Sequence, residues 1–350
     1  MKLKNKLLTI STAVAGALAF STPVQAVDVD YYGWVHTFIE SDKVTGGSDG
    51  DSKPGVKLTN FISVLGVTMT EPLNDIYPGM KYQFKVVTDI YTDNQTDNDN
   101  GERFVNRDTR VGNQTITSSI FTNQWGVAVG HDAHLVWKRL RENAPLRDLE
   151  GTMIGEIHQR QKLRFSNAIF SWYEPVKGVK LMGDYSFSEK EDVDDPWTIS
   201  TEITTIKNLR LTGTYWTAGE AATGYNETNE TSLFTASYQL DDVGLEGTKI
   251  WYTYSDDAYK DLESQGNSVY LSQQITPKFN VAAGYGWRDT DDVKAYNGGF
   301  NYILTKNLQI QGRFLIEKAD NEINMTTAND LGGQMGTDRV NYGLGLKFTF

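Results

Sequence analysis

Four histidines are the side chains of this sequence best suited to acid–base or metal chemistry. His131 and His134 flank Asp132 in the run His-Asp-Ala-His, which offers either a base with a carboxylate or two metal ligands. Their spacing suits a helix better than a strand, and no third ligand stands out among the other histidines. We therefore expect no metal site, no cofactor and no catalytic residue in this chain.

Acidic residues crowd the segment 93–102, where calcium binding is the first hypothesis to test. Placing Gly101 at the invariant glycine of an EF-hand loop puts Thr96 where the first aspartate must stand. The calcium motif therefore fails.

Charges of both signs gather between residues 131 and 164, where the alternation seen in the rest of the chain is interrupted. Such a segment supplies an electric field rather than covalent chemistry. Residues 135–140 have the pattern of a short amphipathic helix. The basic members are Lys138, Arg139, Arg141, Arg147, Arg160, Lys162 and Arg164, and the acidic members are Glu142, Asp148, Glu150 and Glu156.

The elements that must position these side chains are strands. In the final segment, 339–350, apolar residues alternate with polar or small ones, and successive side chains of a strand point to opposite faces. One face carries Val340, Tyr342, Leu344, Leu346, Phe348 and Phe350, and the other carries Asn341, Gly343, Gly345, Lys347 and Thr349.

Sixteen such ribbons follow one another along the chain. Most have roughly 10 to 12 residues, the length that a tilted strand needs to cross a bilayer. The sequence thus predicts an all-β fold, a 16-stranded antiparallel transmembrane β-barrel, because only helices and closed barrels satisfy their backbone hydrogen bonds in hydrocarbon. The ribbons lie near 29–40, 56–70, 80–92, 109–120, 125–131, 164–173, 180–188, 197–206, 209–217, 231–240, 248–255, 268–276, 279–289, 294–304, 308–318 and 339–350.

The connections between the ribbons alternate in length. Short periplasmic turns and longer external loops are typical of outer-membrane barrels, and 131–164 is then the third long loop. The tight connections are 174–179, 207–208, 241–247, 277–278 and 305–307, and the long polar ones include 45–53, 93–108, 189–196, 218–230, 256–267 and 319–338.

The N-terminus has the pattern of an export signal. Lys2, Lys4 and Lys6 precede an apolar run, and Ala26 is a small residue suited to cleavage. We expect residues 1–26 to be removed and residues 27–350 to form one barrel domain. Loss of the three lysines takes the net charge from −12 to −12 − 3 = −15, which disfavours a nucleic-acid partner, and the chain has no cysteine for disulfide or thiolate chemistry.

Three stretches resemble the general porins of Gram-negative outer membranes, and the resemblance spans essentially the whole mature chain. The terminal Phe350 is similar to the aromatic end that the barrel-insertion machinery recognises in this family. The three stretches are Tyr32-Gly33, similar to the opening strand of the family; Asn106-Arg107-Asp108 with Val111-Gly112, similar to its fourth strand; and 164–175 with Gly178-Val179, similar to its sixth strand and following turn.

In that family the third loop folds inward and presents acidic side chains opposite a basic ladder, so the resemblance implies a constriction in the pore. Arg107 and Arg164 match basic residues of the family's wall. Asp148 and Glu150 are then the expected acidic members of the loop, while Arg147 leaves the sign of the field open. The alternative is a solvated external loop.

The parity of the ribbons adds further pore-lining candidates. His36, Gln83 and Lys85 fall on the polar face of their ribbons, so we expect them to line the pore. Arg110 has the opposite parity to Arg107, which predicts either a position near the rim or a bulge in the strand.

We expect passive, weakly selective diffusion of small hydrophilic solutes and ions through the outer membrane. The acidic surplus of the chain favours cations, and the basic wall opposes that preference. The family resemblance implies a homotrimer surrounded by outer-membrane lipid and lipopolysaccharide. The alternatives are a substrate-specific outer-membrane channel and, from a different class, a barrel hydrolase that uses His131 or His134.

Overall fold

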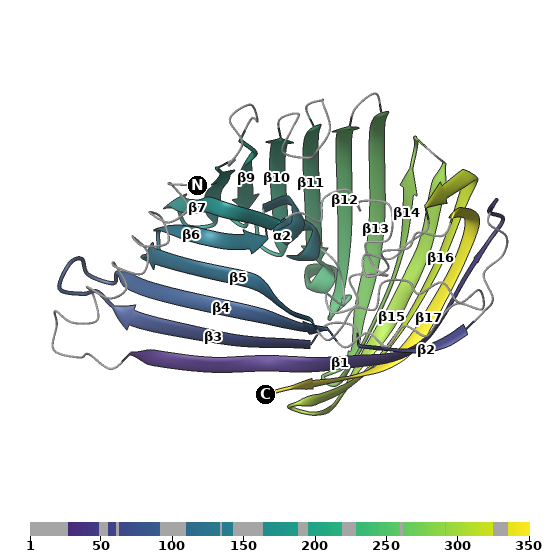
Figure 1. The fold of residues 1–350 in the computed structure, drawn as a ribbon, viewed down its shortest axis with the longest axis horizontal. Coiled ribbons are helices and arrows are strands. Elements are labelled where there is room, and N and C mark those ends of the chain that lie inside the picture. The colour runs from purple at the N-terminus through teal and green to yellow at the C-terminus, as the bar shows by residue number, and fades with distance from the viewer. Residues whose placement is uncertain are drawn as a thin grey trace.

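The computed structural model describes residues 27–48, 55–60, 63–91, 110–133, 135–142, 164–187, 195–218, 229–259, 262–290, 292–324 and 335–350. Strands run through nearly all of this part of the chain and form a ring around helix α2 (Leu135–Glu142) (Figure 1). A 3-10 helix, η3 (Leu240–Val243), lies in one of the turns. No helix in the described segments is both long and apolar enough to cross a bilayer.

The first strands in chain order are β1 (Asp28–Thr45), β2 (Gly55–Asn60), β3 (Ser63–Pro72), β4 (Lys81–Tyr91), β5 (Arg110–Phe121), β6 (Trp125–Ala133), β7 (Arg164–Val176), β8 (Val179–Ser186) and β9 (Trp197–Ile203). They are followed by β10 (Leu209–Ala218), β11 (Asn229–Gln239), β12 (Thr248–Tyr259), β13 (Leu262–Thr276), β14 (Phe279–Arg288), β15 (Val293–Thr305), β16 (Leu308–Asn324) and β17 (Met335–Thr349).

The ring closes because β1 has partners along both edges. It pairs antiparallel with β17 on one side and with β2 and β3 on the other. Residues 37–42 of β1 face β2 and residues 28–34 face β3, so β2 and β3 are two parts of one barrel strand. The 17 segments thus make the closed 16-stranded antiparallel barrel that the sequence predicts.

The two faces of the barrel differ as the alternation predicts. The alternating apolar residues of β17 from Val340 onward, together with the terminal Phe350, are 42–58% exposed on the outer face. Arg339 and Asn341, which alternate with them, are 1% exposed. The outer face is therefore an apolar band suited to lipid, and the inner face is polar.

The tight turns gather at one end of the barrel. Asn208 and Gly178 adopt the left-handed backbone conformation in two of these turns, with φ of 64° and 84°. At the other end, the strands continue beyond the predicted ribbons. The predicted long loop at 256–267 is wrong, because β12 and β13 extend until only residues 260–261 lie between them. Polar side chains are tolerated on both faces of these strand ends because the ends lie outside the hydrocarbon region, where both faces contact water.

Candidate functional site

Helix α2 packs on the inner wall of the barrel. Val136 and Leu140 lie four residues apart and so share one face of the helix. They pack against Ala168, Trp216 and Leu233, which belong to β7, β10 and β11, in a buried apolar cluster. The amphipathic helix predicted near 135–140 is confirmed. The remainder of the third loop, 143–163, lies outside the described residues, so its inward course stays a prediction.

Asp184 of β8 holds the first turn of α2. Its Oδ2 accepts a hydrogen bond from the backbone N–H of Leu135 at 2.7 Å. The first N–H groups of a helix have no partner within the helix, and a carboxylate there also interacts favourably with the helix dipole. One turn later, Lys138 Nζ lies 2.7 Å from Asp132 Oδ2, and Thr115 Oγ1 donates to Asp132 Oδ1 at 3.0 Å. The N-terminal half of the helix is thus bound to β6 and β8, and Thr115 of β5 supports Asp132.

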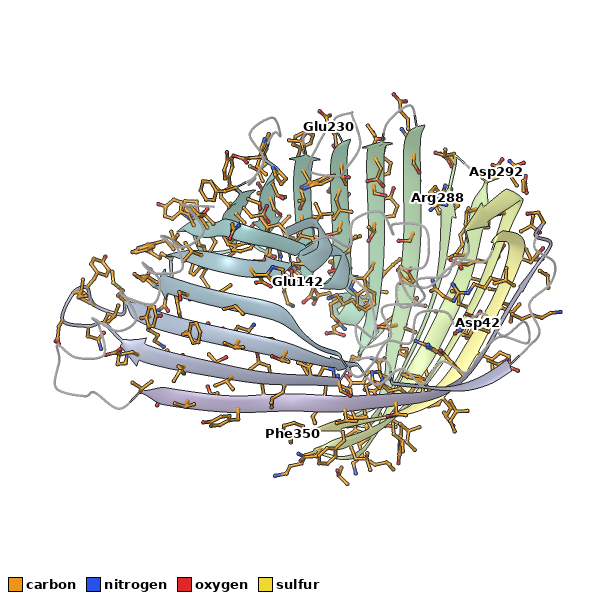
Figure 2. The ribbon with its side chains drawn as sticks, in the orientation of Figure 1. Asp42, Glu142, Glu230, Arg288, Asp292 and Phe350 are labelled. Atoms are coloured by element: carbon orange, nitrogen blue, oxygen red, sulfur yellow. The ribbon has the colours of Figure 1, made fainter. Side chains whose placement is uncertain are left out.

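Four charged side chains lie at the C-terminal end of α2, and we call them the α2 ion cluster: Arg139, Glu142, Glu202 and Arg210. Arg210 Nη2 lies 2.6 Å from Glu142 Oε2 and 2.5 Å from Glu202 Oε2. Arg139 Nη1 lies 2.8 Å from Glu202 Oε2 and also pairs with Glu142. The α2 ion cluster therefore ties the helix to β9 and β10, and Figure 2 shows Glu142 inside the ring.

The environment of Glu142 favours its charged form. Burial disfavours the carboxylate, but the guanidinium groups of Arg139 and Arg210 outweigh that effect and lower the pKa of Glu142 below its usual value. Glu142 is therefore a fixed negative charge at neutral pH.

A second set of charges, which we call the seam network, lies where β1 meets β16 and β17: Glu40, Asp42, Arg313, Glu317 and Arg339. Arg339 makes a two-fold contact with Asp42, with Nε to Oδ1 at 3.0 Å and Nη2 to Oδ2 at 2.7 Å. Its Nη1 lies 3.6 Å from Glu317, and Arg313 pairs with Glu40. Paired charges of this kind cross-link the strands on either side of the closure.

Three lysines of the inner face lie over tryptophan rings. Lys180 Nζ is 4.5 Å from the ring centroid of Trp172, and Lys249 Nζ is 4.9 Å from that of Trp251. Lys347 Nζ is 5.1 Å from the ring of Trp34. Such contacts hold each ammonium group close to the wall and leave its charge in place.

Three of the predicted pore-lining residues lie on the inner-facing side of their strands. Lys85 and Gln83 pair in register with Thr117 and Ser119 of β5, and Thr117 is buried on the inner face. His36 is 2% exposed, with its ring centroid 4.6 Å from that of Phe38.

The other predicted site residues are not brought together by the described part of the chain. Arg164 begins β7 at a position paired with Ala133. Arg107, Arg147, Asp148 and Glu150 lie outside the described residues, so the constriction that they would form stays a prediction.

The strand parity of Arg110 is explained by a bulge. The register between β4 and β5 shifts between Val87 and Thr88, and Arg110 then pairs with Tyr91. Tyr91 lies an even number of residues from Lys85, so the shift brings the backbone position of Arg110 into phase with the inner-facing residues of β4.

The histidine motif is divided between the two faces. His131 pairs in register with Ile116, an outer-face residue, whereas the adjacent Asp132 binds Lys138 inside the barrel. His134 and His158 lie outside the described residues. Among the described residues, no three His, Asp or Glu side chains are grouped to hold a metal ion.

The α2 ion cluster and the seam network were not predicted from the sequence. Parity alone places Glu202, Arg210 and Arg313 on polar faces, which is a signal that could have found them. Their pairing joins residues that are up to 297 positions apart, as for Arg339 with Asp42, and the pattern of a single strand does not contain that information.

The comparisons with known proteins agree with this geometry. The sequence pattern described as Gram-negative porin matches residues 9–321, so the chain belongs to the Gram-negative porin family. Family and fold together define an outer-membrane protein that forms a diffusion channel. No curated protein sequence matches the chain.

Solved porin structures share the fold at low sequence identity. The anion-selective porin from Comamonas acidovorans has a TM-score of 0.71 and 16% identity, over 93% of this chain and 100% of that chain. The trimer form of OmpT from Vibrio cholerae has a TM-score of 0.65 and 14% identity, over 93% and 100%. OmpF of Salmonella typhi in complex with daunomycin has a TM-score of 0.64 and 12% identity, over 92% and 97%.

Proposed function

We propose that the mature chain, residues 27–350, conducts small hydrophilic solutes and ions passively through a lumen that is narrowed beside α2. The observation that carries this proposal is the placement of α2 on the inner wall, with fixed charges at both of its ends. Selectivity then needs only pore width, wall hydrogen bonds and charge. The proposal includes no catalytic step, metal or cofactor.

The proposed constriction combines the helix with the rest of the third loop. Asp148 and Glu150, with Arg147, would face a basic wall that includes Arg107, Arg164 and Lys85. Gln83 and His36 would line the same pore. The inner-facing position of Lys85 and Gln83 supports this arrangement.

The proposal also covers export and assembly. Residues 1–26 would be cleaved during export, and three copies of the barrel would assemble among outer-membrane lipid and lipopolysaccharide. The family match supports export, and the printed trimer form of OmpT from Vibrio cholerae supports self-association.

Single-channel conductance of the purified, folded mature protein in planar bilayers tests the proposal, with the reversal potential measured under a salt gradient. We expect current steps in multiples of three and a small reversal potential. Its sign decides between the cation preference expected from the acidic surplus and the anion preference favoured by Lys85, Lys180 and Lys249. A verified folded barrel without conductance would contradict the diffusion channel.

A substrate-specific channel is the second candidate, and the pairs Lys180–Trp172 and Lys249–Trp251 favour it. A ring beside an ammonium group suits a solute that carries both an aromatic ring and a carboxylate. Benzoate added to one side should then block the potassium chloride current at lower concentrations than acetate does. Equal effects of the two anions would leave general diffusion as the better description.

A further inference from the structure

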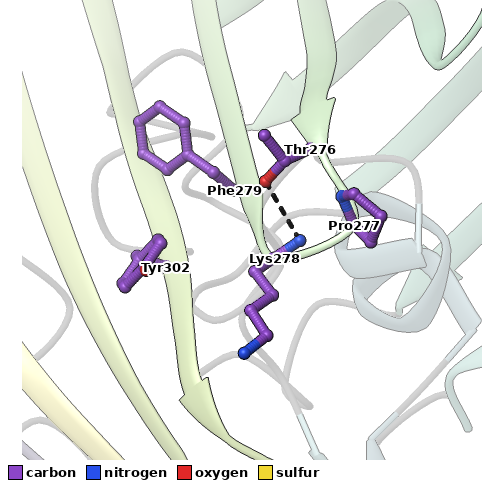
Figure 3. Close-up of a pocket in the computed structure, with 5 residues that line it drawn as sticks. All are labelled: Thr276, Pro277, Lys278, Phe279 and Tyr302. Carbon is purple, nitrogen blue, oxygen red and sulfur yellow. Dashed lines mark hydrogen bonds between the residues drawn. The ribbon is translucent and has the colours of Figure 1, made fainter.

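A groove with a volume of about 630 Å³ lies on the outer face of the barrel, at the turn between β13 and β14 (Figure 3). Its lining residues are Thr276, Pro277, Lys278, Phe279 and Tyr302. Phe279 and Tyr302 face each other across β14 and β15, with ring centroids 6.1 Å apart, and Tyr302 is 40% exposed. Two aromatic rings thus form the apolar wall of the groove.

Two hydrogen bonds made by the backbone of Lys278 hold its turn in place. The Lys278 N–H donates to Thr276 Oγ1 at 3.2 Å, and the Lys278 carbonyl accepts from the Ile303 N–H at 2.8 Å. The side chain of Lys278 therefore starts from a fixed point at the rim of the groove, beside the rings (Figure 3).

The charge of Lys278 is not neutralised within the described residues. Lys207, in another turn at the same end of the barrel, pairs with Asp242 at 2.7 Å, whereas no carboxylate in the described part of the chain pairs with Lys278. A lysine at the boundary of the apolar band stands at headgroup level, and aromatic rings are favoured at the same level. The groove thus combines an available cation with an apolar aromatic wall.

We propose that this groove binds a single glycerophospholipid of the membrane leaflet on the side of the tight turns. The lipid phosphate lies at the Lys278 ammonium group, and the first part of an acyl chain lies across Phe279 and Tyr302. A phosphate ion alone does not suffice, because one exposed ammonium group in water attracts it weakly. The acyl chain supplies the remaining affinity by covering the rings.

Native mass spectrometry of the folded mature protein tests this site, with dioleoyl phosphatidylglycerol added to the detergent micelles. We expect one retained lipid per chain beyond the unspecific background. Lys278→Gln and Tyr302→Ala should each lower that retention several-fold. Lys177→Gln is the matched control, because it removes the same charge from another exposed turn at the same end, away from the groove.

Three results would overturn the proposal. They are unchanged retention by Lys278→Gln, equal losses for Lys278→Gln and Lys177→Gln, and retention of inorganic phosphate in place of the lipid. A change of oligomeric state in Tyr302→Ala would assign the groove to a subunit contact instead. Heat-dependent migration on gels verifies folding of each variant. The conductance of Lys278→Gln should equal that of the wild type because the groove lies outside the lumen, so failure of this proposal is separate from failure of the channel function.

Discussion

Glu142 is the residue whose charge we expect to affect ion selectivity most directly. Its carboxylate lies between Arg139 and Arg210, so Glu142→Gln leaves an additional positive charge inside the barrel. One unit charge about 8 Å from a permeating ion is worth about 0.5 kcal/mol in water. This amount favours anions and disfavours cations at the same time, so the permeability ratio of anions to cations should rise roughly five-fold before salt screening, as measured by the reversal potential under a salt gradient.

Asp75→Asn is the matched control for this change, because Asp75 is exposed in the turn between β3 and β4. It removes the same charge outside the lumen and should leave the reversal potential unchanged at physiological salt, where charges are screened within about 8 Å. Equal shifts in the two variants would mean that total charge, and not the α2 ion cluster, sets the selectivity.

The same carboxylate predicts a pH dependence. The pKa of Glu142 is lower in the folded barrel than in the unfolded chain, so its contribution to folding is complete above the unfolded value. That contribution is lost as the pH falls through the lower folded value. The contribution of Glu142 to selectivity should thus stay constant from about pH 7 to about pH 5 and move toward anions only in more acidic solution. The acid-induced change should be smaller in Glu142→Gln; an identical pH profile would exclude Glu142 as its source.

At the residue scale, strand parity predicted which side of the sheet several of the candidate residues face. Lys85, Gln83 and His36 lie on the inner-facing side because the alternation of their ribbons is uninterrupted. The side of the sheet that position 110 faces could not be predicted, because it depends on a β-bulge that no residue type in the sequence indicates. The partners within the α2 ion cluster could not be predicted either, since they depend on how a helix and two distant strands meet.

At the scale of elements, Asp184 should control how firmly α2 stays on the wall. Asp184→Ala removes the acceptor of the Leu135 N–H, and loss of a helix cap costs about 1 kcal/mol. We expect more frequent conductance fluctuations in single-channel recordings, because the helix then leaves the wall more often. Asp184→Asn keeps an oxygen acceptor and should fall between Ala and the wild type. Equal open-channel noise in all three proteins would show that the apolar packing of Val136 and Leu140 suffices.

The strands themselves were predictable, and their ends were not. A ribbon that spans the hydrocarbon must alternate, which the sequence of β17 shows in full. Beyond the bilayer both faces meet water, so the alternation of apolar and polar residues disappears while the backbone pairing continues. The strands β12 and β13 illustrate this, because their paired ends at 256–259 and 262–267 have the polar composition of a loop.

At the scale of the whole molecule, the barrel depends on one closure between the two ends of the chain. Phe350 and Gly33 exchange two backbone hydrogen bonds, of 3.0 and 3.2 Å, at the foot of the seam between β1 and β17 (Figure 2). A Cβ atom on Gly33 would lie 2.5 Å from Phe350 Cζ and equally close to the Val64 carbonyl oxygen. Only glycine therefore lets the terminal ring cover the first strand.

Gly33→Ala should consequently weaken the closed barrel, because overpacking of this kind costs about 1–3 kcal/mol. The measurement is the temperature at which the folded band on a gel converts to the unfolded band, and we expect it to fall. Gly213→Ala is the control, since nothing lies within 4 Å of its added Cβ atom. Combining Gly33→Ala with Phe350→Ala should recover part of the loss, because the ring is one of the two groups that the methyl meets. Equal stability of Gly33→Ala and Gly213→Ala would mean that the seam between β1 and β17 adjusts to a side chain at position 33. The barrel would then close through the seam network and the strand pairing, and not through the fit of Phe350 against Gly33.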